Sequence, residues 1–272
     1  MGDATSPDFD PRRACAWPRR LKQGPIRMIE PSELRSWILV EDEELIVVNK
    51  PGDVVCHPSK AGPWSSLVGA VREHASLAAA HLIFRLDRET SGVVVLAKTP
   101  AMASRLQKAM QRRLVRKSYL AILSGELPGE VTVDQPLGDD EHSPVFVKSA
   151  VRPDGQAAVS RFTPVSWGGG FTLARVVTET GRKHQIRAHA RWLGYPLVGD
   201  KIYGPDDHLF IEFLDTGYTP ELAERLLLPR QALHCARIDL REAGLDRVFT
   251  APLAPDLQDF CSSRGLRSPV PA

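Results

Sequence analysis

The sequence has only four cysteines, and none of them lies in a C-x-x-C pair. Cys56 and Cys235 each adjoin a histidine, but adjacent residues do not have the spacing of zinc ligands, so no metal site is expected. The cysteine spacing indicates no disulfide framework, which fits a reducing compartment. The chain also lacks a run of 18 apolar residues, and its first residues lack the apolar centre of a signal peptide. These absences predict a soluble cytoplasmic protein.

Net charge is small as well, at +2 for 272 residues, so the total charge says little about partners. The distribution of charge says more. Residues 99–117 include six basic side chains and no acidic one, and residues 181–191 include four basic side chains and no acidic one. Such segregation suggests a basic face that meets a polyanion, although two solvated helix faces would have the same composition.

A short charged loop carries the first candidate for chemistry. Asp87 lies between Arg85 and Arg88, residues 90–92 then interrupt the chain, and the apolar run 93–97 is predicted to be a buried strand. The flanking cations should keep Asp87 ionised, and an ionised carboxylate can act as a nucleophile or a base. A structural ion pair at the entrance of a strand would produce the same pattern.

The remaining pattern predicts a flexible N-terminal tail over residues 1–30 and one domain over residues 31–272. Alternating or continuous apolar runs predict strands over residues 38–40, 45–50, 118–123, 159–165, 171–178, 233–240 and 248–251. Capping residues and apolar periodicity predict helices over residues 66–75, 100–116, 184–193 and 221–228. Strands outnumber helices and do not alternate with them regularly, so the expected fold class is α+β, with a mixed, mainly antiparallel sheet and flanking helices.

Two further stretches carry candidate binding residues. Gly181 precedes a predicted helix whose first turn carries Arg182, Lys183 and His184, and basic side chains at a helix N-terminus suit a phosphate. Arg187, one turn further along, shares a face with His184 and could supply the cation that holds the carboxylate in the charged loop.

Lys117 and Tyr119 alternate along a predicted strand, so their side chains should point to the same side. An aromatic ring beside a cation suits a nucleobase turned out of its stack, because it offers a stacking surface with a phosphate anchor. An ordinary core position for Tyr119 is the alternative.

Together these stretches resemble the motifs of the RluA-type family of RNA pseudouridine synthases, in order from about Ile38 to Pro252. The segments that carry the resemblance are residues 47–58, 85–92, 117–121, 181–204 and 230–235. Two departures stand out: Phe84 occupies a position where many family members have His, and the segment before residue 31 is too short for the S4-type RNA-binding domain of many relatives. RNA selection would then depend on the catalytic domain.

The resemblance implies a central RNA-binding cleft and the isomerisation of uridine in ribosomal or transfer RNA by a monomer without a cofactor or metal. The glycosidic bond is broken, the uracil rotates, and C5 is joined to the same sugar carbon. Asp87 matches the family's essential aspartate, Tyr119 its active-site tyrosine and Arg187 the basic partner of the aspartate. Asp87 could attack the anomeric carbon or remove a sugar proton. The expected RNA-binding residues are Arg85, Arg88, Arg112, Arg113, Lys117, Arg182, Lys183 and His184.

Two other classes of protein remain open at this point. One is a catalytically silent RNA-binding relative, which the intact Asp87 and Tyr119 argue against. The other is a carboxylate-based glycoside hydrolase, which needs two acidic residues that flank the bond. Glu89 is the only acidic neighbour of Asp87 in the sequence.

Overall fold

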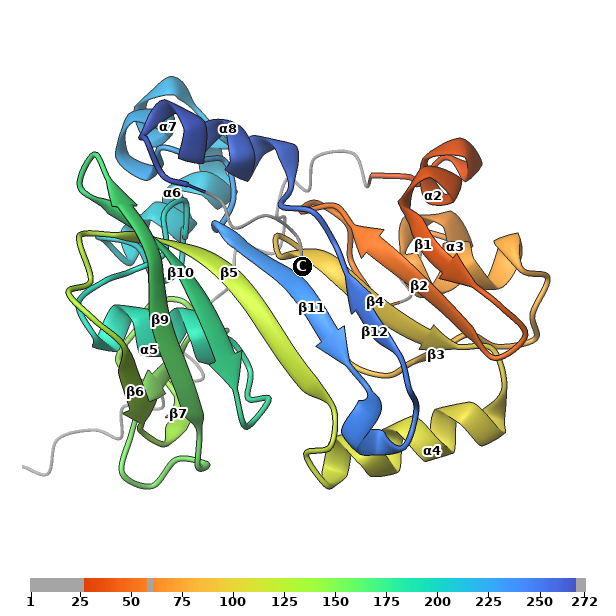
Figure 1. The fold of residues 1–272 in the computed structure, drawn as a ribbon. Helices are drawn as coiled ribbons and strands as arrows, with labels where there is room; N and C mark the ends of the chain where they lie inside the picture. The colour runs from red at the N-terminus through yellow and green to blue at the C-terminus, as the bar shows by residue number, and fades with distance from the viewer. Residues whose placement is uncertain (1–26, 58–60, 268–272) are drawn as a thin grey trace, which may run out of the picture.

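A computed structural model describes residues 27–57 and 61–267 of the chain. Ten strands form one sheet, in the order β1-β2-β4-β11-β5-β10-β9-β6, with β3 paired to β4 and β12 paired to β11 (Figure 1). Every pair in this sheet is antiparallel except β4 with β11. The predicted α+β class and the mainly antiparallel sheet are therefore confirmed.

The strands and helices have the following bounds. The large sheet consists of β1 (Ile38–Glu41), β2 (Leu45–Lys50), β3 (His81–Leu82), β4 (Ser91–Ala97), β5 (Arg116–Ser124), β6 (Val131–Asp134), β9 (Val159–Gly168), β10 (Phe171–Thr178), β11 (Leu233–Asp239) and β12 (Val248–Thr250). A separate pair consists of β7 (Leu137–Asp139) and β8 (Ser149–Val151). The helices are α2 (Pro31–Trp37), α3 (Leu67–His74), α4 (Pro100–Gln111), α5 (Gln185–Trp192), α6 (His208–Thr216), α7 (Pro220–Leu226) and α8 (Pro255–Ser263).

The predicted helix starts rest on capping side chains that the structure contains. Ser66 accepts a hydrogen bond from the N–H of Gly69, and Thr99 accepts one from the N–H of Met102, each three residues into the helix. The predicted end of α4 is wrong, however. The helix stops at Gln111, and Arg113 then takes a left-handed conformation with φ of 58°. This turn leads the chain into β5.

The predicted tail is only partly testable, because residues 1–26 lie outside the described residues. Its last residues are packed against the domain. Ile29 is buried and donates its N–H to the carbonyl of Trp64 at 2.7 Å, and Arg27 forms ion pairs with Glu33 and Asp53. The packed part of the chain therefore begins before the predicted boundary at residue 31.

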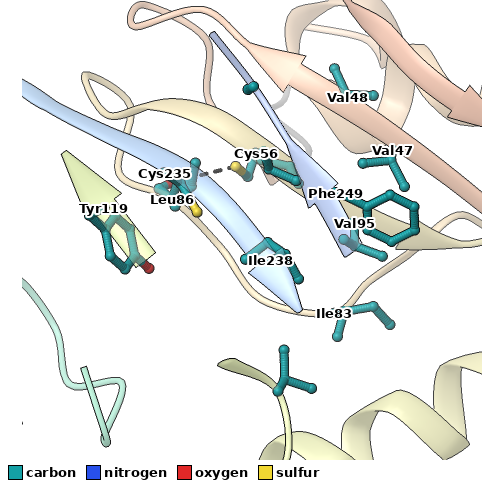
Figure 2. Close-up of a cluster of buried hydrophobic side chains, with 14 of the residues drawn as sticks. Val47, Val48, Cys56, Ile83, Leu86, Val95, Tyr119, Cys235, Ile238 and Phe249 are labelled. Carbon is teal, nitrogen blue, oxygen red and sulfur yellow. Dashed lines mark hydrogen bonds between the residues drawn. The ribbon is translucent and has the colours of Figure 1, made fainter. Parts of the chain in front are cut away.

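The largest core cluster brings the loop before β4 against the sheet. All seven residues of β4 are buried, as expected for a central strand. Figure 2 shows Leu86 and Tyr119 beside Cys235 at the edge of a cluster that includes Val95 and Ile238. Because Leu86 is anchored in this core, the next residue, Asp87, is held at the edge where the apolar packing ends.

Candidate active site

Asp87 lies in the loop between β3 and β4, and a buried lysine ties this loop to the end of β2. The Nζ of Lys50 donates to the carbonyls of Pro51, Val54 and Arg88 at 2.8, 2.9 and 3.0 Å. Burial lowers the pKa of this ammonium to about 8. Three carbonyl acceptors compensate for its removal from water, so the backbone next to Asp87 is fixed by a contact from another strand.

Arg187 on α5 bridges two carboxylates. Its Nε and Nη2 donate to the two oxygens of Asp200 at 2.7 and 2.8 Å, and its Nη1 donates to Oδ2 of Asp87 at 2.9 Å. Asp200 is fully buried and also accepts the backbone N–H groups of Ile202 and Tyr203. The paired contact with Asp200 therefore orients the guanidinium, and its remaining edge points at Asp87.

The ion pair determines the protonation state of Asp87. Burial would raise the pKa of this carboxyl, but the charge and hydrogen bond of Arg187 outweigh burial and hold the pKa below its ordinary value. Asp87 is therefore ionised at neutral pH, as predicted. Of the two predicted sources of positive charge, Arg187 is the one that pairs with Asp87, whereas Arg88 donates to the carbonyl of Asp53 and neither Arg85 nor Arg88 forms an ion pair with Asp87.

The two oxygens of Asp87 have different surroundings. Oδ2 accepts from Arg187, lies 3.8 Å from Nε2 of His184, and is 3.4 Å from Nε2 of Gln231. No described residue forms a hydrogen bond or ion pair with Oδ1. Gln231, which the sequence analysis did not single out, donates more strongly to Oγ1 of Thr90, at 2.7 Å. One oxygen of Asp87 is thus held in place while the other keeps its lone pairs for a reacting atom.

The three predicted catalytic residues line one cleft of about 370 Å³. Its walls come from the loop before β4, the first half of β5, the segment after β10 and the start of α5. Four of the predicted binding residues line it too: Arg85, Lys117, Arg182 and His184. The expectation that Lys117 and Tyr119 point to the same side is confirmed. A lining that combines basic side chains with apolar and aromatic ones is suited to a nucleotide, because it can hold both a phosphate and a base.

The other predicted binding residues lie outside this cleft. The Nζ of Lys183 forms an ion pair with Asp139 at 2.6 Å, and Arg88 is directed at a backbone carbonyl. Arg112 is an exposed residue at the end of α4 and lines neither the cleft nor the smaller hollow beside it, whereas Arg113 lines that hollow. Sequence proximity to a motif was therefore a poor guide to which cations face the cleft.

The phosphate site expected at the start of the helix stays a prediction, but its geometry differs from the one expected. Helix α5 begins at Gln185, so Arg182, Lys183 and His184 precede its first turn. The backbone N–H of Arg182 already donates to the side-chain carbonyl of Gln185 at 3.0 Å, which leaves that N–H unavailable to an anion. His184 instead shares a hydrogen bond of 3.0 Å with the hydroxyl of Tyr203, and burial lowers the pKa of its imidazole to about 4.

Tyr119 packs in the core and also lines the cleft. The two interpretations of this residue, a core position and a stacking surface for a base, are therefore compatible. Only 8% of its surface is exposed, and it packs in the main cluster while it also lines the cleft. Burial raises its pKa well above the ordinary value, so its hydroxyl is protonated at neutral pH. Tyr119 can therefore present an aromatic face and a proton donor to the same ligand.

Two further findings concern the described part of the chain alone. It contains no group of three or more His, Cys, Asp or Glu residues arranged to hold a metal ion. It also contains no helix that is long and apolar enough to cross a membrane.

Comparisons with known proteins point to one family. The family model described as RNA pseudouridylate synthase matches residues 44–192, which include Asp87, Tyr119 and Arg187. Ribosomal large subunit pseudouridine synthase D of Vibrio parahaemolyticus is 35% identical over 227 residues, 81% of this chain and 68% of that protein. An uncharacterized RNA pseudouridine synthase of Chloroflexus aurantiacus is 37% identical over 218 residues, 77% of this chain and 63% of that protein.

A solved structure agrees as well. Human RNA pseudouridylate synthase domain containing 4 superposes with a TM-score of 0.70 at 25% identity, over 88% of this chain and 97% of that chain. The chain therefore belongs to the RNA pseudouridylate synthase family, and it is an enzyme that isomerises uridine in RNA to pseudouridine.

Proposed function

We propose that this protein converts one or more uridines of large-subunit ribosomal RNA to pseudouridine, with Asp87 as the reacting group. The observation that carries the proposal is the 2.9 Å ion pair between Asp87 and Arg187 in the wall of a cleft that Tyr119 also lines. The name of the Vibrio relative refers to the large ribosomal subunit, which supports ribosomal RNA over transfer RNA.

The cleft residues have separate roles in this proposal. The target uridine is turned out of the folded RNA, at a cost of a few kcal/mol, and its uracil stacks on the ring of Tyr119. Arg187 keeps Asp87 ionised and oriented. Arg85, Lys117 and the other basic residues of the rim bind the RNA backbone, which offsets the cost of extruding the base.

The reaction conserves every atom of the RNA. The bond from C1′ to N1 breaks, the uracil rotates, a bond forms from C1′ to C5, and the proton lost from C5 is balanced by one gained at N1. The Oδ1 of Asp87 either attacks C1′ and is displaced when C5 bonds to C1′, or removes a sugar proton that returns once C5 is attached, and both routes use its lone pair. The proposal includes a monomer that acts on RNA in the cytoplasm.

Mapping of pseudouridine in total RNA tests the substrate. In a strain that lacks this protein, at least one pseudouridine of large-subunit ribosomal RNA should be absent, and the purified protein should restore it in an unmodified transcript. Transfer RNA from the same strain provides the comparison. An unchanged ribosomal map with a pseudouridine missing from transfer RNA would replace the proposed substrate.

The hydroxyl of Tyr119 can be separated from its ring. We expect Tyr119→Phe to lower the single-turnover rate by roughly 10²–10⁴-fold, the range for loss of a positioned proton donor or acceptor, while RNA affinity stays near the wild-type value. Tyr218→Phe is the matched control, because Tyr218 is 39% exposed and lies outside the cleft. A wild-type rate for Tyr119→Phe would mean that the ring alone is used.

A further inference from the structure

A second hollow adjoins the cleft. It has a volume of about 240 Å³ and lies between the end of α4, the start of β5 and the segment that follows β10. This volume far exceeds the roughly 10–15 Å³ that a single water needs. The residues that the hollow shares with the cleft are Met110, Lys117, Thr178, Thr180, Gly181 and Arg182. A ligand in the cleft could therefore continue into the hollow without leaving the protein surface.

The charge of this hollow is mostly positive. Arg113, Arg116, Lys117 and Arg182 line it, against the single carboxylate of Glu179. Arg116 is neutralised by Glu242, which it contacts at 2.9 Å. The side chain of Arg113 has no hydrogen-bond or ion-pair partner within the described residues, so its guanidinium is available to an anion.

Lys117 forms the wall between the cleft and the hollow. It is 8% exposed, and within residues 27–57 and 61–267 its ammonium has no hydrogen-bond acceptor and no carboxylate partner. The ammonium lies over the face of the Phe84 ring, 5.7 Å from the ring centroid, and it interacts electrostatically with the thiol of Cys235. Burial of an uncompensated charge is unfavourable. A cation kept in this state is suited to an anion that binds from outside.

Gly181 leaves room for that anion. A Cβ at this position would lie 3.3 Å from Nζ of Lys117. Because Gly181 has no side chain, the ammonium of Lys117 stays accessible from both the cleft and the hollow.

We propose that the hollow binds the sugar and phosphate of a nucleotide adjacent to the target uridine, and that Lys117 holds the phosphate that joins the two nucleotides. This proposal rests on the proposed function for the position of the target uridine in the cleft. Arg113, on the far side of the hollow, contacts the next phosphate along the strand. The bound partner is thus a single-stranded segment of RNA, held by consecutive phosphates on either side of the boundary between the cleft and the hollow.

A scan of single phosphates tests this arrangement. The probe is the shortest ribosomal RNA oligonucleotide that the wild-type protein modifies, synthesised with one uncharged methylphosphonate at a time. Lys117→Gln removes the buried cation, and Arg113→Gln removes the second one. Arg35→Gln is the matched control, because Arg35 is exposed on α2, which lies at the opposite end of the sheet from α5 (Figure 1).

We expect wild-type affinity to fall about tenfold, as for one charge-assisted contact, when the methylphosphonate occupies one of the two linkages that flank the target uridine. Lys117→Gln should bind the unmodified oligonucleotide about tenfold more weakly than the wild type does. A methylphosphonate at that flanking linkage should then cause no further loss of affinity in this variant. A methylphosphonate one linkage further out should weaken RNA binding by the wild type but not by Arg113→Gln. Arg35→Gln should respond to each methylphosphonate as the wild type does.

Two results would overturn the proposal. One is equal sensitivity of the wild type and Lys117→Gln at the flanking linkage, and the other is a wild type that is indifferent to both flanking linkages. Pseudouridine formation in the unmodified oligonucleotide is measured first. A wild type that modifies no RNA would contradict the proposed function at that step, before any phosphate is replaced.

Discussion

Asp87→Asn is expected to abolish pseudouridine formation while the protein stays folded and binds RNA. The amide lacks the negative charge and the basicity that either chemical route requires, so the rate should fall by roughly 10²–10⁴-fold or more. The fold should survive, because Arg187 keeps both of its hydrogen bonds to Asp200. The measurements are pseudouridine per RNA molecule after long incubation, the Kd for the RNA, and the melting temperature.

Glu89→Gln is the matched control for this experiment. Glu89 lies on the same loop, but its Oε1 accepts from Nζ of Lys201 at 2.7 Å and its Oε2 accepts from the N–H of Gln231. A glutamine oxygen can accept only one of these two hydrogen bonds, but neither contact involves Asp87, so turnover should stay far closer to the wild-type rate than in Asp87→Asn. Substantial turnover by Asp87→Asn, or a loss with Glu89→Gln as severe as with Asp87→Asn, would contradict the assignment. The second result would favour a mechanism with two carboxylates.

The fold was most predictable from sequence where one local signal decides the structure. Thr99 and Thr219 each precede a proline and cap the helix that follows, so α4 and α7 could be predicted. Helices α2, α6 and α8 were missed, because none of them follows a serine or threonine cap. The carboxylate of Asp207, just before α6, pairs with Lys148 at 2.6 Å instead of the helix, and α8 follows Ala254. The end of α4 was missed because no glycine marks its left-handed turn at Arg113.

The site was predictable only in part, because its contacts join residues far apart in the chain. Arg187 and Asp87 are 100 residues apart, and their pairing was expected from the resemblance and from the helical face of Arg187. Gln231 is 144 residues from Asp87, and although it lies in the segment 230–235 that carries part of the resemblance, nothing in that segment indicates a contact with Asp87. Arg85 and Arg88 were expected to pair with Asp87 and do not, for the opposite reason. They are neighbours of Asp87 in sequence, but in an irregular loop adjacent side chains point in different directions.

Removal of Arg187 is expected to affect stability as strongly as activity. Arg187→Ala leaves Asp200, which is fully buried, and Asp87 without their shared cation. Loss of one partner of a buried ion pair typically costs about 3–5 kcal/mol. The free energy of unfolding, measured in urea at pH 7, should fall by that amount. Arg35→Gln, an exposed substitution on α2, should leave it nearly unchanged.

Arg187→Lys tests the electrostatic role in a protein that stays folded. A lysine ammonium can replace the contact with Asp200 but lacks the planar fork that reaches Asp87 at the same time. Asp87 would then lose the charge that lowers its pKa, while the effect of burial, which raises it, would remain. The pKa of Asp87 should therefore rise, because the opposite charge that favours its ionised form no longer faces it.

The pH–rate profile of Arg187→Lys shows whether this happens. The wild type needs ionised Asp87, whose pKa lies below 3.8, so its rate should fall only in strong acid. In the variant the acidic limb should move to higher pH, so that activity is lost in mild acid and recovers as the pH rises. His184, with a pKa of about 4, also titrates beside Asp87. The pH–rate profile of His184→Gln is therefore measured in parallel, to show how much of the acidic limb is due to this histidine. Superimposable acidic limbs for Arg187→Lys and the wild type would mean that another group sets the charge state of Asp87.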